Sequence, residues 1–219
     1  MQALLNPVEA RVLGALVEKQ ITTPDYYPLT LNGLTTACNQ KSNRFPVVAF
    51  DEKTVVRAQE SLRDKELARM VSGADMRVPK YYHLFVEKFE LTPPQVAALC
   101  VLMLRGPQTT GEIRGRSSRL YEFADLGEVE QTLKALSERD RGAMTMQLER
   151  QPGRKEARYA HLLCGEPEAV AEEEGPVEPA ALELRADNER IAALEGEVIA
   201  LRDELAALQR AFEEFKGQF

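Results

Sequence analysis

The sequence predicts a mainly α-helical protein with small β-hairpins, an α+β fold that consists of two tandem copies of one domain followed by a long C-terminal helix. Three observations predict this organisation. The first part of the chain is repeated in the second, each copy ends in two short strand patterns joined by a turn, and an acidic stretch precedes a heptad pattern of apolar residues. We therefore expect domains at 1–88 and 89–164, a linker at 165–179 and the long helix at 180–217.

Both copies begin with the same helix signal. Residues 5–13 and 91–99 align, and in each segment a residue that favours the N-cap, Asn6 or Thr92, is followed by proline. Proline is well tolerated at the first helical position, where the N–H that it lacks has no partner inside the helix. Apolar residues then recur at helical spacing, which predicts an amphipathic helix at the start of each copy.

A second and a third helix are predicted in each copy. Residues 30–38 and 111–119 follow breaks that contain threonine, which can cap a helix. The third helices align with one constant offset and start after Asp51 and Asp125, two further N-cap residues. Each copy therefore has three helices before its strands.

The end of each copy has the pattern of a β-hairpin. The strands are predicted at 67–72 and 80–85 in the first copy and at 144–149 and 158–163 in the second. The second pair flanks a proline and a glycine, which are strong turn formers. Three helices and a hairpin, with a helix-turn-helix pair before the strands, is the order of a winged-helix domain. We therefore predict two tandem winged-helix domains.

Charge is distributed unevenly along the chain. Residues 1–88 carry a net charge of +2 and residues 89–164 carry +1. Residues 165–219 carry −10, which makes the net charge of the whole chain −7. The mildly basic front suits a nucleic-acid partner despite the acidic total. The N-terminus lacks the pattern of a secretory signal, and charges interrupt every run that approaches the length of a membrane span. We therefore expect a cytoplasmic protein with no membrane partner.

Residues typical of catalytic or metal sites are scarce. The three cysteines are far apart, and the two histidines, His83 and His161, occupy equivalent positions next to tyrosines in the two copies. The chain contains no glycine-rich phosphate-binding motif. This pattern favours packing roles, so we expect no catalytic residue, no metal, no cofactor and no enzymatic activity.

Polar and basic residues gather where helix-turn-helix proteins face DNA. In the first copy, the connection between the second and third helices is rich in amide and basic side chains, which reach base edges and phosphates. The second copy has arginines in the matching connection and a basic hairpin turn. A solvated loop accounts for these places equally well. The candidate nucleic-acid-binding residues are Asn39, Gln40, Lys41, Asn43, Arg44, Arg57, Arg114, Arg116, Arg119, Arg150, Arg154 and Lys155.

The third helices, which enter the major groove in the usual docking of this motif, have mixed charge. In the first copy Lys53 and Arg57 share the helix with Glu52 and Glu60, and the helix of the second copy starts near Glu128. Two hypotheses therefore stay open. The leading one is a DNA-binding protein, a transcriptional regulator whose partner is double-stranded DNA. The alternative is a scaffold for protein partners, a use that paired winged helices have in chromosome-segregation complexes.

The tail predicts a homodimer. Residues 165–179 are rich in Glu, Pro and Ala and form a linker, because so little apolar surface does not support a fold. Beyond them apolar residues occupy the a and d positions of a heptad, with β-branched residues at a that favour two parallel strands. An amphipathic helix that folds back on its own domains is the alternative. The predicted dimerisation residues are Leu184, Ile191, Leu194, Val198, Leu201, Leu205, Leu208, Phe212 and Phe215.

Several runs resemble the bacterial YceH-like family. They are residues 9–14, 18–24 and 36–44 in the first copy and 104–109, 121–123 and 151–156 in the second. The resemblance covers residues 5–165, and Ala37-Cys38-Asn39-Gln40-Lys41 is its most distinctive segment. It implies paired winged-helix domains and brings no catalytic or binding residues with it. The linker and the coiled coil are the parts that we expect to vary within such a family.

Overall fold

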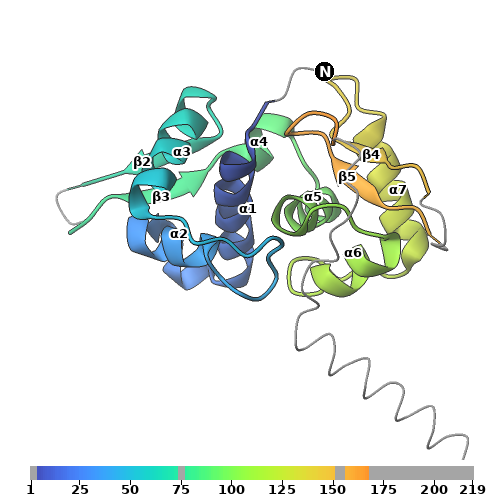
Figure 1. Cartoon of the computed structure of the whole chain (residues 1–219), viewed down its shortest axis with the longest axis horizontal. Helices are drawn as coiled ribbons and strands as arrows, with labels where there is room; N and C mark the ends of the chain where they lie inside the picture. Colours follow the sequence, from blue (N-terminus) through green and yellow to red (C-terminus); the bar gives the residue numbers. More distant parts are fainter. Residues whose placement is uncertain (1–3, 74–76, 151–155, 168–219) are drawn as a thin grey trace, which may run out of the picture. The chain divides into compact units, whose positions relative to one another are not determined.

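The computed structural model describes residues 4–73, 77–150 and 156–167 (Figure 1). Within these ranges the chain is an α+β protein with seven α-helices and two small antiparallel sheets, in an order that repeats three helices and a strand pair. The coiled coil predicted for 180–217 and most of the linker predicted for 165–179 lie outside the described residues.

The first helix of each copy starts where the sequence predicts. Helix α1 (Pro7–Thr22) is capped by Asn6, whose side chain accepts a hydrogen bond from the Glu9 N–H at 2.9 Å while the Glu9 carboxylate accepts one from the Asn6 N–H. At the start of α5 (Pro93–Arg105), the Gln95 side chain accepts from the Thr92 N–H at 3.1 Å. Reciprocal bonds of this kind satisfy N–H groups that have no partner inside the helix.

Neither α1 nor α5 is amphipathic, which corrects the prediction. Every residue of 9–18 in α1 and of 96–104 in α5 is buried. A helix that is buried on all sides lies at the centre of a core. The physical reason is that each of the two helices packs against the other helices of its own copy and also against the first helix of the other copy. Periodicity within one copy carries no information about this second contact.

The third helices begin at their predicted caps, and the second helix of the second copy begins at a threonine of the predicted break, whereas that of the first copy is capped by Thr30 and not by a threonine of the break at 22–24. Each cap side chain, Thr30, Thr109, Asp51 or Asp125, accepts a hydrogen bond from the backbone N–H of the third helical residue. A short 3-10 helix, η1 (Pro24–Tyr26), precedes the second helix of the first copy. The four helices are α2 (Leu31–Cys38) and α3 (Glu52–Asp64) in the first copy and α6 (Thr110–Ser117) and α7 (Leu126–Ser137) in the second.

The predicted strand pairs are present, and the first has an additional strand. Strand β2 (Ala68–Val71) pairs with β3 (Lys80–His83), which also pairs with β1 (Leu29–Thr30), so the sheet order is β1-β3-β2. In the second copy β4 (Thr145–Gln147) pairs with β5 (Tyr159–His161). Strand β1 and the short helix α4 (Phe85–Phe89) were not predicted.

The α1–α5 contact joins the two copies (Figure 1). A Cβ at Gly14 would lie 3.0 Å from Leu104 Cδ2 and 3.2 Å from Met103 Cβ, so glycine permits the close approach of the helices. The Cys100 thiol donates a hydrogen bond to the Gly14 carbonyl at 3.5 Å. All the described residues belong to one compact unit that spans 1–171, and the predicted boundary at 88/89 falls within α4.

No helix in the described part of the chain has both the length and the apolar composition that a membrane crossing requires.

Candidate functional site

The segment between α2 and α3, residues 39–50, is the strongest nucleic-acid candidate in the sequence, and the structure turns most of its polar side chains inward. We call this segment the connector. The Asn39 amide closes its two ends, because its Nδ2 donates to the Phe50 carbonyl and its Oδ1 accepts from the Phe50 N–H, both at 2.8 Å. Asn39 thus has the role of a loop clamp.

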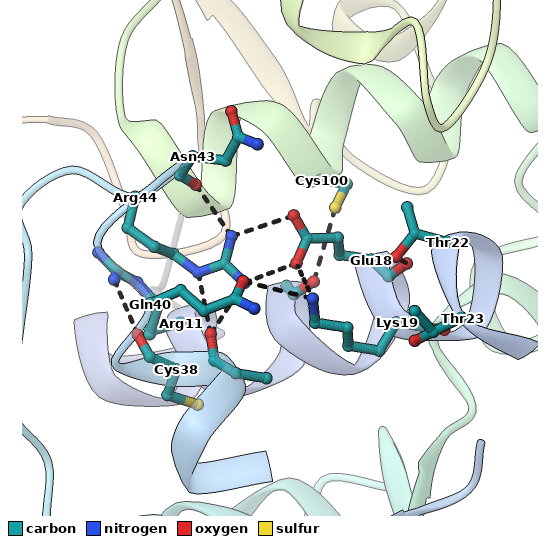
Figure 2. Close-up of polar contacts among 12 residues, drawn as sticks. Arg11, Glu18, Lys19, Thr22, Thr23, Cys38, Gln40, Asn43, Arg44 and Cys100 are labelled. Carbon is teal, nitrogen blue, oxygen red and sulfur yellow. Dashed lines mark hydrogen bonds and ion pairs between the residues drawn. The ribbon is translucent and has the colours of Figure 1, made fainter. Parts of the chain in front are cut away.

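Arg44 forms a buried ion pair with Glu18 of α1 (Figure 2). The residue is 2% exposed, and its guanidinium donates to both carboxylate oxygens of Glu18, at 2.6 Å and 3.1 Å. The same guanidinium donates to the Ala37 carbonyl through Nε and Nη2, and Nη2 also donates to the Gln40 amide oxygen. The prediction that Arg44 contacts a nucleic acid is therefore corrected, because its donors are engaged inside the protein.

The protonation of Glu18 follows from this pairing. Burial by itself raises the pKa of the Glu18 carboxyl, but the hydrogen bonds and the positive charge of Arg44 outweigh it, so the pKa lies below its ordinary value. The carboxylate is therefore ionised at neutral pH. A buried charge pair of this kind requires good geometry and additional hydrogen bonds, and both are present here.

A second buried guanidinium, that of Arg11, holds the connector from the other side. Arg11 lies in α1 and is 4% exposed. Its Nη1 donates to the Cys38 carbonyl at 3.2 Å and its Nη2 to the Pro46 carbonyl at 2.6 Å. Within the described part of the chain, Arg11 has no ion pair with a carboxylate and its Nε has no hydrogen-bond partner. Two arginines and one carboxylate thus share this interior.

The connector also reaches the second copy. The Phe45 N–H donates to the Leu104 carbonyl at 2.9 Å, and Arg105 Nη1 donates to Asn43 Oδ1 at 3.1 Å. The connector is consequently tied to both central helices. Of its residues that the sequence nominated for nucleic-acid contact, Lys41 is the one that stays exposed.

The other nominated residues are dispersed. Arg57 is exposed on α3, and Arg114 is exposed on α6, where it donates to the carbonyls of Phe123 and Ala124. Arg116 forms an ion pair with Glu112 at 3.5 Å. Together with the exposed Arg119 it lines a pocket of about 30 Å³. Arg150 is exposed beyond β4, and Arg154 and Lys155 lie outside the described residues.

The β2–β3 hairpin carries basic side chains that sequence reasoning missed. Arg69 and Arg77 are exposed and Lys80 is half-buried. Neighbouring residues Arg69 and Met70 are both exposed, so this strand has solvent on both faces. In Figure 1 the two strands extend beyond the end of α3. The sequence did contain a signal for this hairpin, because its basic residues lie on both sides of the turn, as they do in the hairpin of the second copy.

The two histidines, His83 and His161, are the last residues of β3 and β5. Burial lowers the pKa of His83 and of His161 to about 4, so both are neutral at pH 7. Neither ring nitrogen of His83 has a hydrogen-bond partner among the described residues. In the same ranges, no group of three His, Cys, Asp or Glu side chains lies close enough to hold a metal ion.

Comparison with other proteins identifies the family. Residues 5–154, which contain α1 to α7 and the whole connector, match the family described as "Protein of unknown function, DUF480". The chain is 57% identical to a UPF0502 protein of Geobacter metallireducens and 55% identical to one of Geobacter sulfurreducens, and each alignment covers 100% of both chains. It belongs to the DUF480/UPF0502 family.

Resemblance to this family extends beyond Geobacter. A UPF0502 protein of Solibacter usitatus is 53% identical over 98% of both chains. The alignments with the Geobacter relatives therefore include the tail of the chain. The match to the DUF480 family covers a shorter range and ends at residue 154. Arg11, Glu18 and Arg44 all fall within the matched range.

Proposed function

We propose that each copy is a winged helix of the YceH-like kind and that the chain is a non-enzymatic, cytoplasmic protein that binds double-stranded DNA and regulates transcription. The observation that carries the proposal is the basic β2–β3 hairpin. Arg69 lies in β2, Arg77 in the segment before β3 and Lys80 at the start of β3, on the hairpin that follows the third helix of its copy. Backbone phosphates are recognised by basic side chains in such positions, without sequence readout.

Helix α3 supports the same surface. It packs against β2, and Lys53 and Arg57 are exposed on it. Glu52, Glu60 and Asp64 are exposed on the same helix, so its contribution to phosphate binding is small. We therefore assign affinity mainly to the hairpin, and we leave Arg44 and Asn39 out of the DNA surface because their side chains hold the connector.

Binding of the full-length protein to a fluorescent random-sequence duplex, measured over a salt series, tests the proposal. The slope of log affinity against log salt is expected to be negative, at about 0.9 per neutralised phosphate. Arg69→Ala with Arg77→Ala should reduce this slope by about 2 if each contacts one phosphate. Lys134→Ala with Arg141→Ala is the charge-matched control, since both side chains are exposed in the second copy. Equal losses in the two double variants would contradict a role for the hairpin.

Dimerisation is the second part of the proposal. Two chains joined through the predicted coiled coil would present two β2–β3 hairpins to one duplex. Once one hairpin is bound, the other is held at a raised effective concentration near the same duplex. Leu194→Asp with Leu201→Asp should convert the dimer to a monomer in light scattering and weaken DNA binding. Circular dichroism should show that the two copies remain folded. A mass that does not change would contradict the dimer.

A protein-interaction scaffold is the second candidate function. One observation favours it, because Met70 and Val78 on the β2–β3 hairpin are each 50% exposed. Exposed apolar side chains beside basic ones are typical of protein interfaces. A protein with this function would show no salt-dependent DNA affinity, so the salt series described above separates the two candidates.

A further inference from the structure

A groove at the junction of the two copies has the properties of a ligand site. Its volume is about 430 Å³, within the range of small-molecule pockets. Four parts of the chain contribute to its walls: the first turns of α1, the connector, the end of α5, and the segment that follows β5. Most of the wall is apolar, with Phe45, Val48, Phe50 and Met103 among its residues.

Arg11 is the one arginine or lysine among the described residues that line the groove, and His161, which also lines it, is neutral at pH 7 because burial lowers its pKa to about 4. Its two Nη atoms bind carbonyl oxygens, which carry no net charge, and Glu18 is engaged by Arg44. Glu166 also lines the groove, but it is exposed and forms no ion pair with Arg11 among the described contacts. The interior therefore has a guanidinium charge without a counter-ion.

Buried charges in proteins are generally paired or bound to ions, because an unpaired charge in an apolar surrounding is costly. Arg11 has no equivalent in the second copy, where the aligned residue is Ala97. Two carbonyl contacts alone do not require a full positive charge at this position. An anion in the groove would supply the missing charge.

We infer that the groove binds a small amphipathic carboxylate whose apolar body lies against the wall residues and whose carboxylate pairs with Arg11. A monoanion matches the single uncompensated charge, and a carboxylate matches the planar guanidinium. The apolar wall selects a ligand whose remaining surface is hydrocarbon. This inference is independent of the proposed DNA binding.

Isothermal titration calorimetry of the full-length protein with decanoate, decanol and decylammonium tests the inference. Decanoate should bind at least about tenfold more tightly than decanol, since the ligands differ only in the charged group that pairs with Arg11. Decylammonium should bind most weakly. Equal affinities for decanoate and decanol, or no binding of decanoate, would overturn the proposal.

Two kinds of variant locate the site. Arg11→Met should remove the preference for decanoate over decanol, and Arg11→Lys should retain part of it. Val48→Trp should weaken decanoate binding at least about tenfold by filling the groove from its half-buried wall, without touching the Arg11 contacts. Val78→Trp, on the remote hairpin, is the matched control and should bind decanoate as the wild type does. Wild-type affinity in Val48→Trp would overturn the proposal even if Arg11→Met failed to fold.

Discussion

Helices α1 and α5 hold equivalent places in the two copies and pack against each other, but they bury different chemistry. The offset that aligns Leu5 with Leu91 pairs Arg11 with Ala97 and Glu18 with Leu104. All four of these central-helix residues are buried. One duplicated helix thus has a polar interior where the other has an apolar one.

The two copies also differ in the segment that joins the second helix to the third. In the second copy this segment is short, and exposed Arg114 holds it by bonds to nearby carbonyls. In the first copy the connector is longer and is held from inside by Arg11 and by the Glu18–Arg44 pair. Buried ion pairs contribute less to stability than apolar packing but fix one arrangement of the groups around them. The polar interior of α1 therefore specifies the shape of the connector.

The largest expected effect comes from breaking the pair. Arg44→Ala leaves the Glu18 carboxylate buried without its partner and should lower the free energy of unfolding by about 3–5 kcal/mol. Arg114→Ala, the counterpart in the second copy, should lower it by about 0.5–1 kcal/mol, because water replaces its bonds. Urea denaturation followed by circular dichroism measures both. Similar losses in the two variants would contradict the distinction between the connector and its counterpart.

The comparison is sharpened by giving α1 the chemistry of α5. Glu18→Leu combined with Arg44→Met removes both charges at once and should recover at least about 2 kcal/mol of the loss in Arg44→Ala. The recovery follows because the Glu18 carboxylate is no longer left in the interior without its partner. The same denaturation experiment applies. A double variant as unstable as Arg44→Ala would mean that the bonds to the Ala37 carbonyl, and not the charge pair, dominate.

The histidines predict a pH effect that the two copies share. Their pKa is about 4 in the folded protein and about 6.5 in the unfolded chain. The unfolded chain therefore binds more protons between these values, and stability should fall as the pH is lowered through that window, by up to about 1.4 kcal/mol per pH unit for each histidine.

Denaturation of the wild type, His83→Leu and His161→Leu at several pH values between 7 and 4 measures this slope. Each variant should lose about half of it. Glu18, with its lowered pKa, acts in a different window: its contribution is present above the unfolded pKa of about 4.3 and is lost as pH falls through the lower folded value. A slope that neither histidine variant changes would contradict the assignment.

The smallest effect concerns the contact between the two helices. Gly14→Ala places a methyl group 3.0 Å from Leu104 Cδ2, and Leu104 is buried with little room to move. Overpacking should outweigh the gain in helix propensity and leave a net loss of about 1 kcal/mol. Gly115→Ala, in open space on α6, should instead gain about 0.5–1 kcal/mol. Stabilisation by both substitutions would show that the α1–α5 contact tolerates the methyl group.

Local signals in the sequence predicted most of the fold. The caps at Asn6, Asp51 and Asp125 are confirmed, because a side chain and a backbone N–H three residues later suffice to start a helix. The two strand pairs are confirmed as well, because the strand pattern and the turn residues between the strands are also local signals. Strand β1 and helix α4 were missed, since the former has two residues and the latter five, too few to give a periodic pattern.

The site was harder to predict because its chemistry depends on contacts between distant segments. Arg44 reads as a surface residue in a polar run, and only its contact with Glu18, far back in α1, places it inside. Arg11 and Glu18 lie in register with apolar residues of α5, and this comparison of the copies was the signal available. Composition alone does not distinguish a polar loop that faces solvent from one that surrounds a buried charge pair.

The α1–α5 contact has a consequence for synthesis of the protein. Helix α1 is synthesised before α5, which packs against it and whose last residue is Arg105. Until α5 has emerged, the surface of α1 around Gly14 lacks part of its burial. Contacts so far apart in sequence form late and slow folding. The first copy thus exposes apolar surface that favours premature association until the second copy has been made.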